Sequence, residues 1–93
     1  MMDIELTISQ AVAAMERNVP EEALALLNDP VIGKNNEVLF LKGEICFKLQ
    51  RWGEALNHFS MFLEQCPGNK KAESYCQMIR NILGFFHKDF YNP

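Results

Sequence analysis

The chain has 93 residues, which is the length of a single domain. Hydrophobic residues make up 48% and charged residues 23%, as in folded proteins and unlike disordered ones. The net charge of −3 argues against a nucleic-acid-binding protein, because such a protein needs a basic face for the phosphates.

The N-terminal stretch lacks the basic residues and the apolar run of a signal peptide, and no window is apolar enough to span a membrane. The three cysteines (Cys46, Cys66 and Cys76) show no C-x-x-C spacing. We therefore expect reduced thiols rather than a metal or disulfide framework. Together these features predict a cytoplasmic protein without a membrane partner.

The first half of the chain predicts two helices. Apolar residues recur at three- and four-residue steps over 4–17, and Asp3 can cap that helix. Pro20 suits the first turn of a second helix over 20–27, since its missing N–H is not needed there. The turn before Pro30 ends it, because a residue that precedes proline is pushed out of the α region.

Three further helices are predicted over 36–49, 52–66 and 69–86. Asn35 or Asn36 can cap the first of them, and a proline–glycine pair precedes the last. No alternating run flanked by hairpin turns predicts a strand. The sequence therefore predicts an all-α fold of five helices, with short connections that favour antiparallel neighbours.

The chain repeats itself at an offset of 32 residues. The stretch PEEALALL (20–27) aligns with WGEALNHF (52–59). Residues of similar character recur at the same offset. Small residues pair as Ala11 with Gly43, Ala14 with Cys46, and Ala23 with Ala55, and the larger apolar residue Leu27 pairs with Phe59. Paired helices approach closely only where side chains are small, so we expect the first pair to meet at Ala11 and Ala23 and the second at Gly43 and Ala55. Phe59 would fill the space between one pair and the next.

Residues 36–69 resemble a tetratricopeptide repeat, a helix–turn–helix unit of about 34 residues. The matching residues are Leu39, Gly43, Trp52, Ala55, Phe59 and Pro67, while Cys46 replaces the usual tyrosine. Residues 4–35 are similar to a degenerate copy, 69–86 resemble the capping helix of such arrays, and 87–93 form an aromatic tail. The resemblance implies one domain, an α-solenoid of two helix pairs plus a capping helix.

Phe62 departs from the family pattern, which has a small residue at that position. We expect Phe62 to push the next helix away or to leave a gap. Tyr75 and Ile79 would then pack around its ring.

The resemblance also implies a concave groove lined by the first helix of each pair. The implied partner-binding residues are Ile8, Val12, Met15, Glu37, Phe40, Glu44, Phe47, Lys48 and Met78. Further concave positions are Glu5, Glu16, Lys71, Ser74 and Asn81. Phe40 and Phe47 lie two turns apart and are expected to point away from the core. Phe40 and Glu44 stand where some members have lysine or asparagine for a ligand's terminal carboxylate, so we do not expect that use.

The groove is expected to prefer a hydrophobic or aromatic segment with some positive charge. The tail carries Phe90 and Tyr91, which have no core of their own. These aromatics could dock on their own chain, dock on a second copy to form a homodimer, or bind a different partner.

The resemblance implies a protein–protein interaction module, a scaffold or adaptor that binds a protein or peptide. The alternatives are a bacterial secretion-type co-chaperone that shields a small apolar helical partner, and a purely structural homo-oligomer. Glu54 and His58 could form a metal ligand pair, but no third ligand is evident. Without a nucleophile elbow or phosphate loop, we expect no enzyme activity, no cofactor and no metal.

Overall fold

A computed structural model of the chain describes residues 3–86, which form five helices. They are α1 (Ile4–Glu16), α2 (Pro20–Leu27), α3 (Asn36–Lys48), α4 (Trp52–Gln65) and α5 (Lys70–Phe86). Residues 3–86 contain no strand, which confirms the all-α class and the order of the five helices.

Hydrogen bonds at the helix starts explain where α1 and α3 begin. Asp3 Oδ1 accepts from the Leu6 N–H at 3.3 Å, as the sequence predicts. Of the two candidate caps for α3, Asn35 is the cap: its Oδ1 accepts from the backbone N–H groups of Glu37 and Val38. Each cap satisfies N–H groups that have no partner within the helix.

The predicted ends of α1, α3 and α4 are each one residue too long, and α5 starts one residue later than predicted. At α1 and α3 the cause is a left-handed residue just beyond the helix, Asn18 with φ 63° and Gln50 with φ 61°. Periodicity does not reveal this change of backbone conformation.

Those two left-handed turns are built alike. The Asn18 N–H donates to Met15 O and the Val19 N–H to Ala14 O. The Gln50 and Arg51 N–H groups donate to the equivalent oxygens, Phe47 O and Cys46 O. This is the hydrogen-bond pattern of a Schellman motif, and it recurs at the 32-residue offset found in the sequence.

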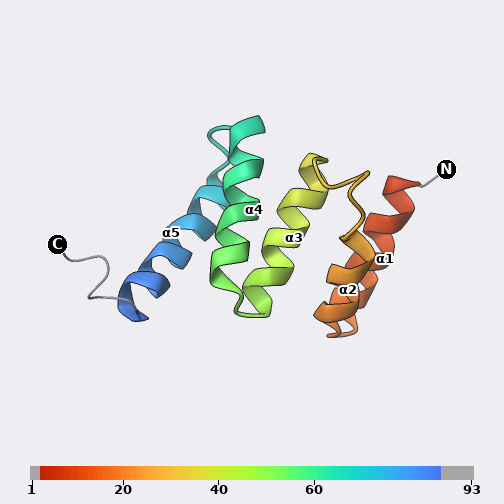
Figure 1. Ribbon diagram of the computed structural model, residues 1–93, viewed down its shortest axis with the longest axis horizontal. Coiled ribbons are helices and arrows are strands. Elements are labelled where there is room, and N and C mark those ends of the chain that lie inside the picture. The colour runs from red at the N-terminus through yellow and green to blue at the C-terminus, as the bar shows by residue number, and fades with distance from the viewer. Residues whose placement is uncertain (1–2, 87–93) are drawn as a thin grey trace.

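Each helix packs against the next one along the chain, so the helices follow one another along the long axis of the molecule (Figure 1). Contacts are most extensive between α3 and α4, then between α1 and α2 and between α4 and α5. α1 and α5 lie at opposite ends of this row. Every short connection therefore joins neighbouring helices.

The small residues predicted to mark close approach lie in the core. Ala11, Ala14, Ala23 and Leu27 belong to one buried cluster, shared by α1, α2 and α3. Cys46, Ala55 and Phe59 belong to a second cluster, shared by α3, α4 and α5. Leu24 packs against both clusters and so connects them.

Phe59 lies directly over Gly43. A Cβ added at residue 43 would stand 2.7 Å from the Phe59 ring. On its other side the ring stacks on Tyr75, with centroids 4.6 Å apart and planes 9° apart. Phe59 therefore fills the space between the α3–α4 pair and α5, as the sequence predicts.

The expected effect of Phe62 is corrected in part. Phe62 is 7% exposed and α5 still packs on α4, so the ring is accommodated in the core. Its closest aromatic partner is Phe40, with ring centroids 5.1 Å apart. Tyr75 and Ile79 belong to the same cluster, but Tyr75 stacks on Phe59.

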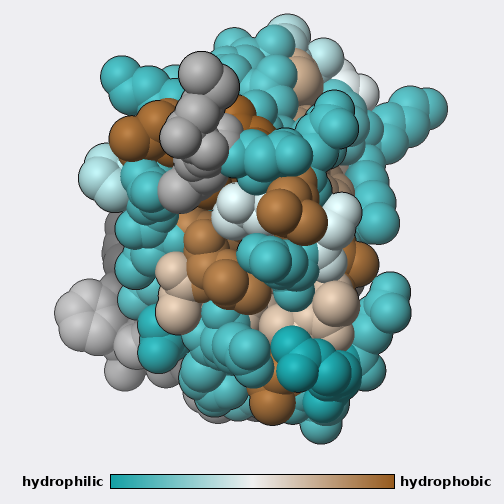
Figure 2. Space-filling view, turned by 90° about the vertical axis from the view of Figure 1, so that its right-hand side faces the viewer, coloured by the Kyte–Doolittle hydropathy of each residue, from teal (hydrophilic) through white to brown (hydrophobic). Residues whose placement is uncertain are grey.

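The end of the molecule formed by α1 and α2 carries apolar side chains scattered among hydrophilic ones (Figure 2). A shallow depression there is lined by Gln10, Ala13, Arg17, Glu22 and Leu26. Over residues 3–86, none of the helices combines the length and the apolar character needed to cross a bilayer.

Replacing Gly43 by alanine tests the close approach of α3 to Phe59. We expect Gly43→Ala to lower the free energy of unfolding by about 1–2 kcal/mol, because overpacking exceeds the gain in helix propensity. Gly53→Ala is the matched control, since a Cβ on Gly53 in α4 meets nothing within 4 Å. It should raise stability by about 0.5–1 kcal/mol. Urea unfolding measures both, and a Gly43→Ala chain as stable as the wild type would contradict the packing.

Candidate functional site

A groove runs over the face that α1, α3 and α5 share, and it consists of two connected hollows. The first hollow, of about 440 Å³, is lined by Val12, Met15, Glu16, Leu41, Glu44, Phe47, Lys48 and Tyr75. The second, of about 380 Å³, is lined by Ile8, Val12, Asn36, Glu37, Phe40, Leu41, Glu44, Phe62, Asn69 and Lys71. Val12, Leu41 and Glu44 border both, so we treat the hollows as one groove.

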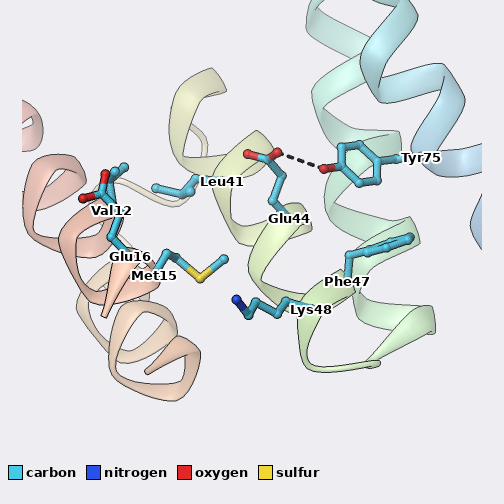
Figure 3. Close-up of a pocket in the computed structure, with 8 residues that line it drawn as sticks. All are labelled: Val12, Met15, Glu16, Leu41, Glu44, Phe47, Lys48 and Tyr75. Carbon is cyan, nitrogen blue, oxygen red and sulfur yellow. Dashed lines mark hydrogen bonds between the residues drawn. The ribbon is translucent and has the colours of Figure 1, made fainter. Parts of the chain in front are cut away.

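The first hollow is open between α1 and α3 (Figure 3). Met15 of α1 and Leu41 of α3 extend into the space between these two helices. Glu44 turns toward α5, where the Tyr75 hydroxyl approaches it. The floor is thus apolar between α1 and α3, and charged side chains lie around it: Glu16 on α1, and Glu44 and Lys48 on α3.

The structure brings most of the predicted binding residues to this groove. Those that line it are Ile8, Val12, Met15, Glu37, Phe40, Glu44, Phe47 and Lys48, joined by Glu16 and Lys71. Met78 is 44% exposed but lines neither hollow. Glu5, Ser74 and Asn81 are exposed and do not line either hollow.

The expectation that Phe40 and Phe47 point away from the core is wrong. Both rings are partly buried against the α3–α4–α5 cluster. Phe40 meets Phe59 and Phe62 edge-on, at centroid distances of 5.4 and 5.1 Å. Phe47 lies between Trp52 and Tyr75, at 5.1 and 5.0 Å. The reason is α5, which brings Tyr75 against this side of α3.

Sequence reasoning missed two residues that shape the groove. Leu41 is not among the predicted groove residues, yet it borders both hollows. Tyr75 was placed in the core, yet it forms part of the first hollow. A signal was present for Tyr75, since a phenolic hydroxyl in a predicted core needs a polar partner.

That partner is Glu44. The Tyr75 hydroxyl donates to Glu44 Oε2 at 3.0 Å, and Lys71 Nζ lies 3.6 Å from the same oxygen. The Glu44 side chain is 26% exposed and the Lys71 side chain 67% exposed. Glu44 therefore joins α3 to α5 through two residues of α5, one half-buried and one largely in solvent.

Burial raises the pKa of Tyr75 to about 12, and the hydrogen bond to Glu44 and its negative charge add to the shift. The Tyr75 hydroxyl therefore keeps its proton at neutral pH and donates a hydrogen bond to Glu44. Tyr75, Glu44 and Lys71 therefore hold α3 and α5 together.

Glu54, one member of the predicted Glu54–His58 pair, contacts two other side chains. Glu54 lies 3.9 Å from Arg51 Nη1 and also accepts a long contact, 3.9 Å, from the Cys46 thiol. Burial, together with the charge of Lys42, lowers the pKa of His58. Over residues 3–86, no group of three metal-ligating side chains comes together.

The predicted docking residues Phe90 and Tyr91 lie outside the residues that the structure describes. Their three possible uses stay predictions.

No model of a known protein family, no curated protein and no solved structure matches the chain. The assignment of a function therefore depends on the groove and on the residues that line it.

The raised pKa of Tyr75 predicts how stability changes in alkali. Between the ordinary tyrosine pKa of about 10 and the folded value of about 12, the folded chain keeps a proton that the unfolded chain has lost. The contribution of Tyr75 is therefore complete below about pH 10 and is lost as the pH rises through about 12.

Ultraviolet titration of a Tyr91→Phe chain, which keeps one tyrosine, measures that pKa directly. Glu44→Gln should lower it only in part, because burial is the larger cause. Tyr75→Phe should make stability fall less steeply between pH 10 and 12. Ionisation of Tyr75 near pH 10 in the folded Tyr91→Phe chain would contradict the raised pKa of Tyr75.

Proposed function

We propose that the chain is a protein–protein interaction module whose groove binds an apolar segment of another protein. The observation that carries the proposal is the groove itself, an open and largely apolar depression on the face shared by α1, α3 and α5. A two-part hollow of this size suits a peptide or one face of a helix. Such a module would act as a scaffold or adaptor.

The proposal includes a repeat architecture of the tetratricopeptide kind. Two features support it: the identical Schellman turns at Asn18 and Gln50, and the buried small residues that recur at the same 32-residue offset. In such an array the odd-numbered helices line one face, and the groove lies on that face. α5 would then be the capping helix.

The polar groups of the groove favour binding over catalysis. The hydroxyl of Tyr75 and the carboxylate of Glu44 are engaged with each other, and the pKa of Tyr75 lies far above neutrality. Efficient acid–base catalysis needs a group that titrates near the working pH. Among residues 3–86, those that line the two hollows include no serine, threonine, cysteine or histidine that could serve as a paired nucleophile and base.

Substitution of Val12 tests whether the groove is the binding surface. Peptides of about twelve residues would first be selected against the full chain by phage display. Val12→Gln should weaken the selected peptides about fivefold to tenfold, since about 1 kcal/mol of apolar contact is lost. Trp52, the single tryptophan, packs on the groove residue Phe47 and can report binding by fluorescence.

Val31→Gln is the matched control, because Val31 is 82% exposed and lines neither hollow. It should leave affinity unchanged. Light scattering during size exclusion checks that a second copy does not occupy the groove. If Val12→Gln binds the selected peptides as tightly as the wild type does, the groove is not the binding surface.

A further inference from the structure

A cation of the chain itself already lies at the edge of the groove. Lys71 Nζ is 3.6 Å from Glu44 Oε2 and 5.6 Å from the centroid of the Phe40 ring. A carboxylate and an aromatic face together attract an ammonium or guanidinium group. Because Phe40, Glu44 and Lys71 all line the second hollow, this pair of attractive groups opens into the groove.

The two halves of this arrangement are held unequally. Glu44 is the fixed half: it is largely shielded from solvent and accepts the hydrogen bond from Tyr75. Lys71 is the loose half, since its side chain is 67% exposed. The distance from Lys71 Nζ to Glu44 Oε2, 3.6 Å, also exceeds that of a strong charge-assisted hydrogen bond. Exposed ion pairs of this kind add little stability, so Lys71 can leave without loss to the fold.

We propose that Lys71 occupies the place of a basic side chain of the partner. This inference rests on the proposed function. The bound segment carries lysine or arginine among its apolar residues, and that cation replaces Lys71 beside Glu44 and Phe40. The apolar residues cover the floor formed by Val12 and Leu41. Lys71 then extends from the exposed side of α5 into solvent.

The charge of the groove fits a basic partner. Its lining includes three carboxylates (Glu16, Glu37 and Glu44) and two ammonium groups (Lys48 and Lys71). Among residues 3–86, Glu16 and Glu37 join no ion pair. A segment with one or two positive charges would therefore meet a groove of complementary sign.

The partner's cation has an advantage over Lys71 for a physical reason. A segment seated in the groove excludes water from Glu44, and an ion pair strengthens as the local dielectric constant falls. Lys71 cannot provide that cover, because it reaches Glu44 from the rim. Arginine gains further, since its planar group can stack on Phe40 while donating to the carboxylate.

The test uses two peptides of about twelve residues, built from leucine, phenylalanine and two lysines, in which one twin has both lysines acetylated. Affinities for the full-length chain are read from Trp52 fluorescence. Lys71→Met keeps the apolar stem and removes the competing cation. It should tighten the charged peptide about threefold to tenfold and leave the acetylated twin unchanged.

Lys70→Met is the control for a general change of charge, because Lys70 is exposed, adjacent, and in no ion pair among residues 3–86. It should tighten the charged peptide less than Lys71→Met does. Glu44→Gln retains an acceptor for Tyr75 and should weaken binding of the charged peptide while it leaves the acetylated twin unchanged.

The outcomes separate the two proposals. If Lys71→Met binds the charged peptide no more tightly than Lys70→Met, or if Glu44→Gln keeps the full preference for charge that the wild type shows, the cation site is wrong. If the acetylated twin binds with full dependence on Val12 while charge has no effect, the proposed function stands and the cation site alone fails. If neither peptide binds the wild type, both proposals are overturned.

Discussion

The position of the Phe59 ring determines how the last three helices fit together. The ring occupies the space that a side chain on residue 43 would need, so α3 and α4 approach at glycine. Its face stacks on Tyr75 of α5 at 4.6 Å. One side chain thus sets the distance between two helices and the placement of a third. Because dispersion contacts weaken steeply with small gaps, α5 cannot shift along α3 without loss of this packing.

The packing of Phe59 on Tyr75 also positions the polar groups at the edge of the groove. Tyr75 is held by its stack on Phe59, and its hydroxyl therefore reaches Glu44 at a fixed point on the rim. Lys71 lies one turn earlier on α5 and approaches the same carboxylate from solvent. The core thus orients the acidic group, while the cation beside it is free to exchange. A rigid carboxylate with a displaceable cation is a suitable recognition element for a basic segment.

The places where helices approach closely could be predicted from residue size, but the way in which one helix crosses another could not. Residue size marks Gly43 and Ala55 as places of close approach, and both are buried. That the side chain lying on Gly43 is Phe59 was not predicted and comes from the structure. Phe40 was expected to point away from the core, yet it packs on the core while it lines the groove. A helical period gives a face but does not say which neighbour covers it. The Glu44–Tyr75 bond joins residues 31 positions apart, so it depends on how α5 crosses α3. Periodicity within one helix holds no information about that crossing.

α1 and α2 are joined to α3 mainly on the side away from the groove. α2 packs on α3 more extensively than α1 does, and Leu24 of α2 touches both core clusters. α2 has eight residues, too few to be stable alone, so the first pair depends on this limited contact. On the groove side, Val12 of α1 and Leu41 of α3 face a shared hollow. A segment that covers both would tie α1 to α3 directly, and its binding free energy would add to the stability of the whole array.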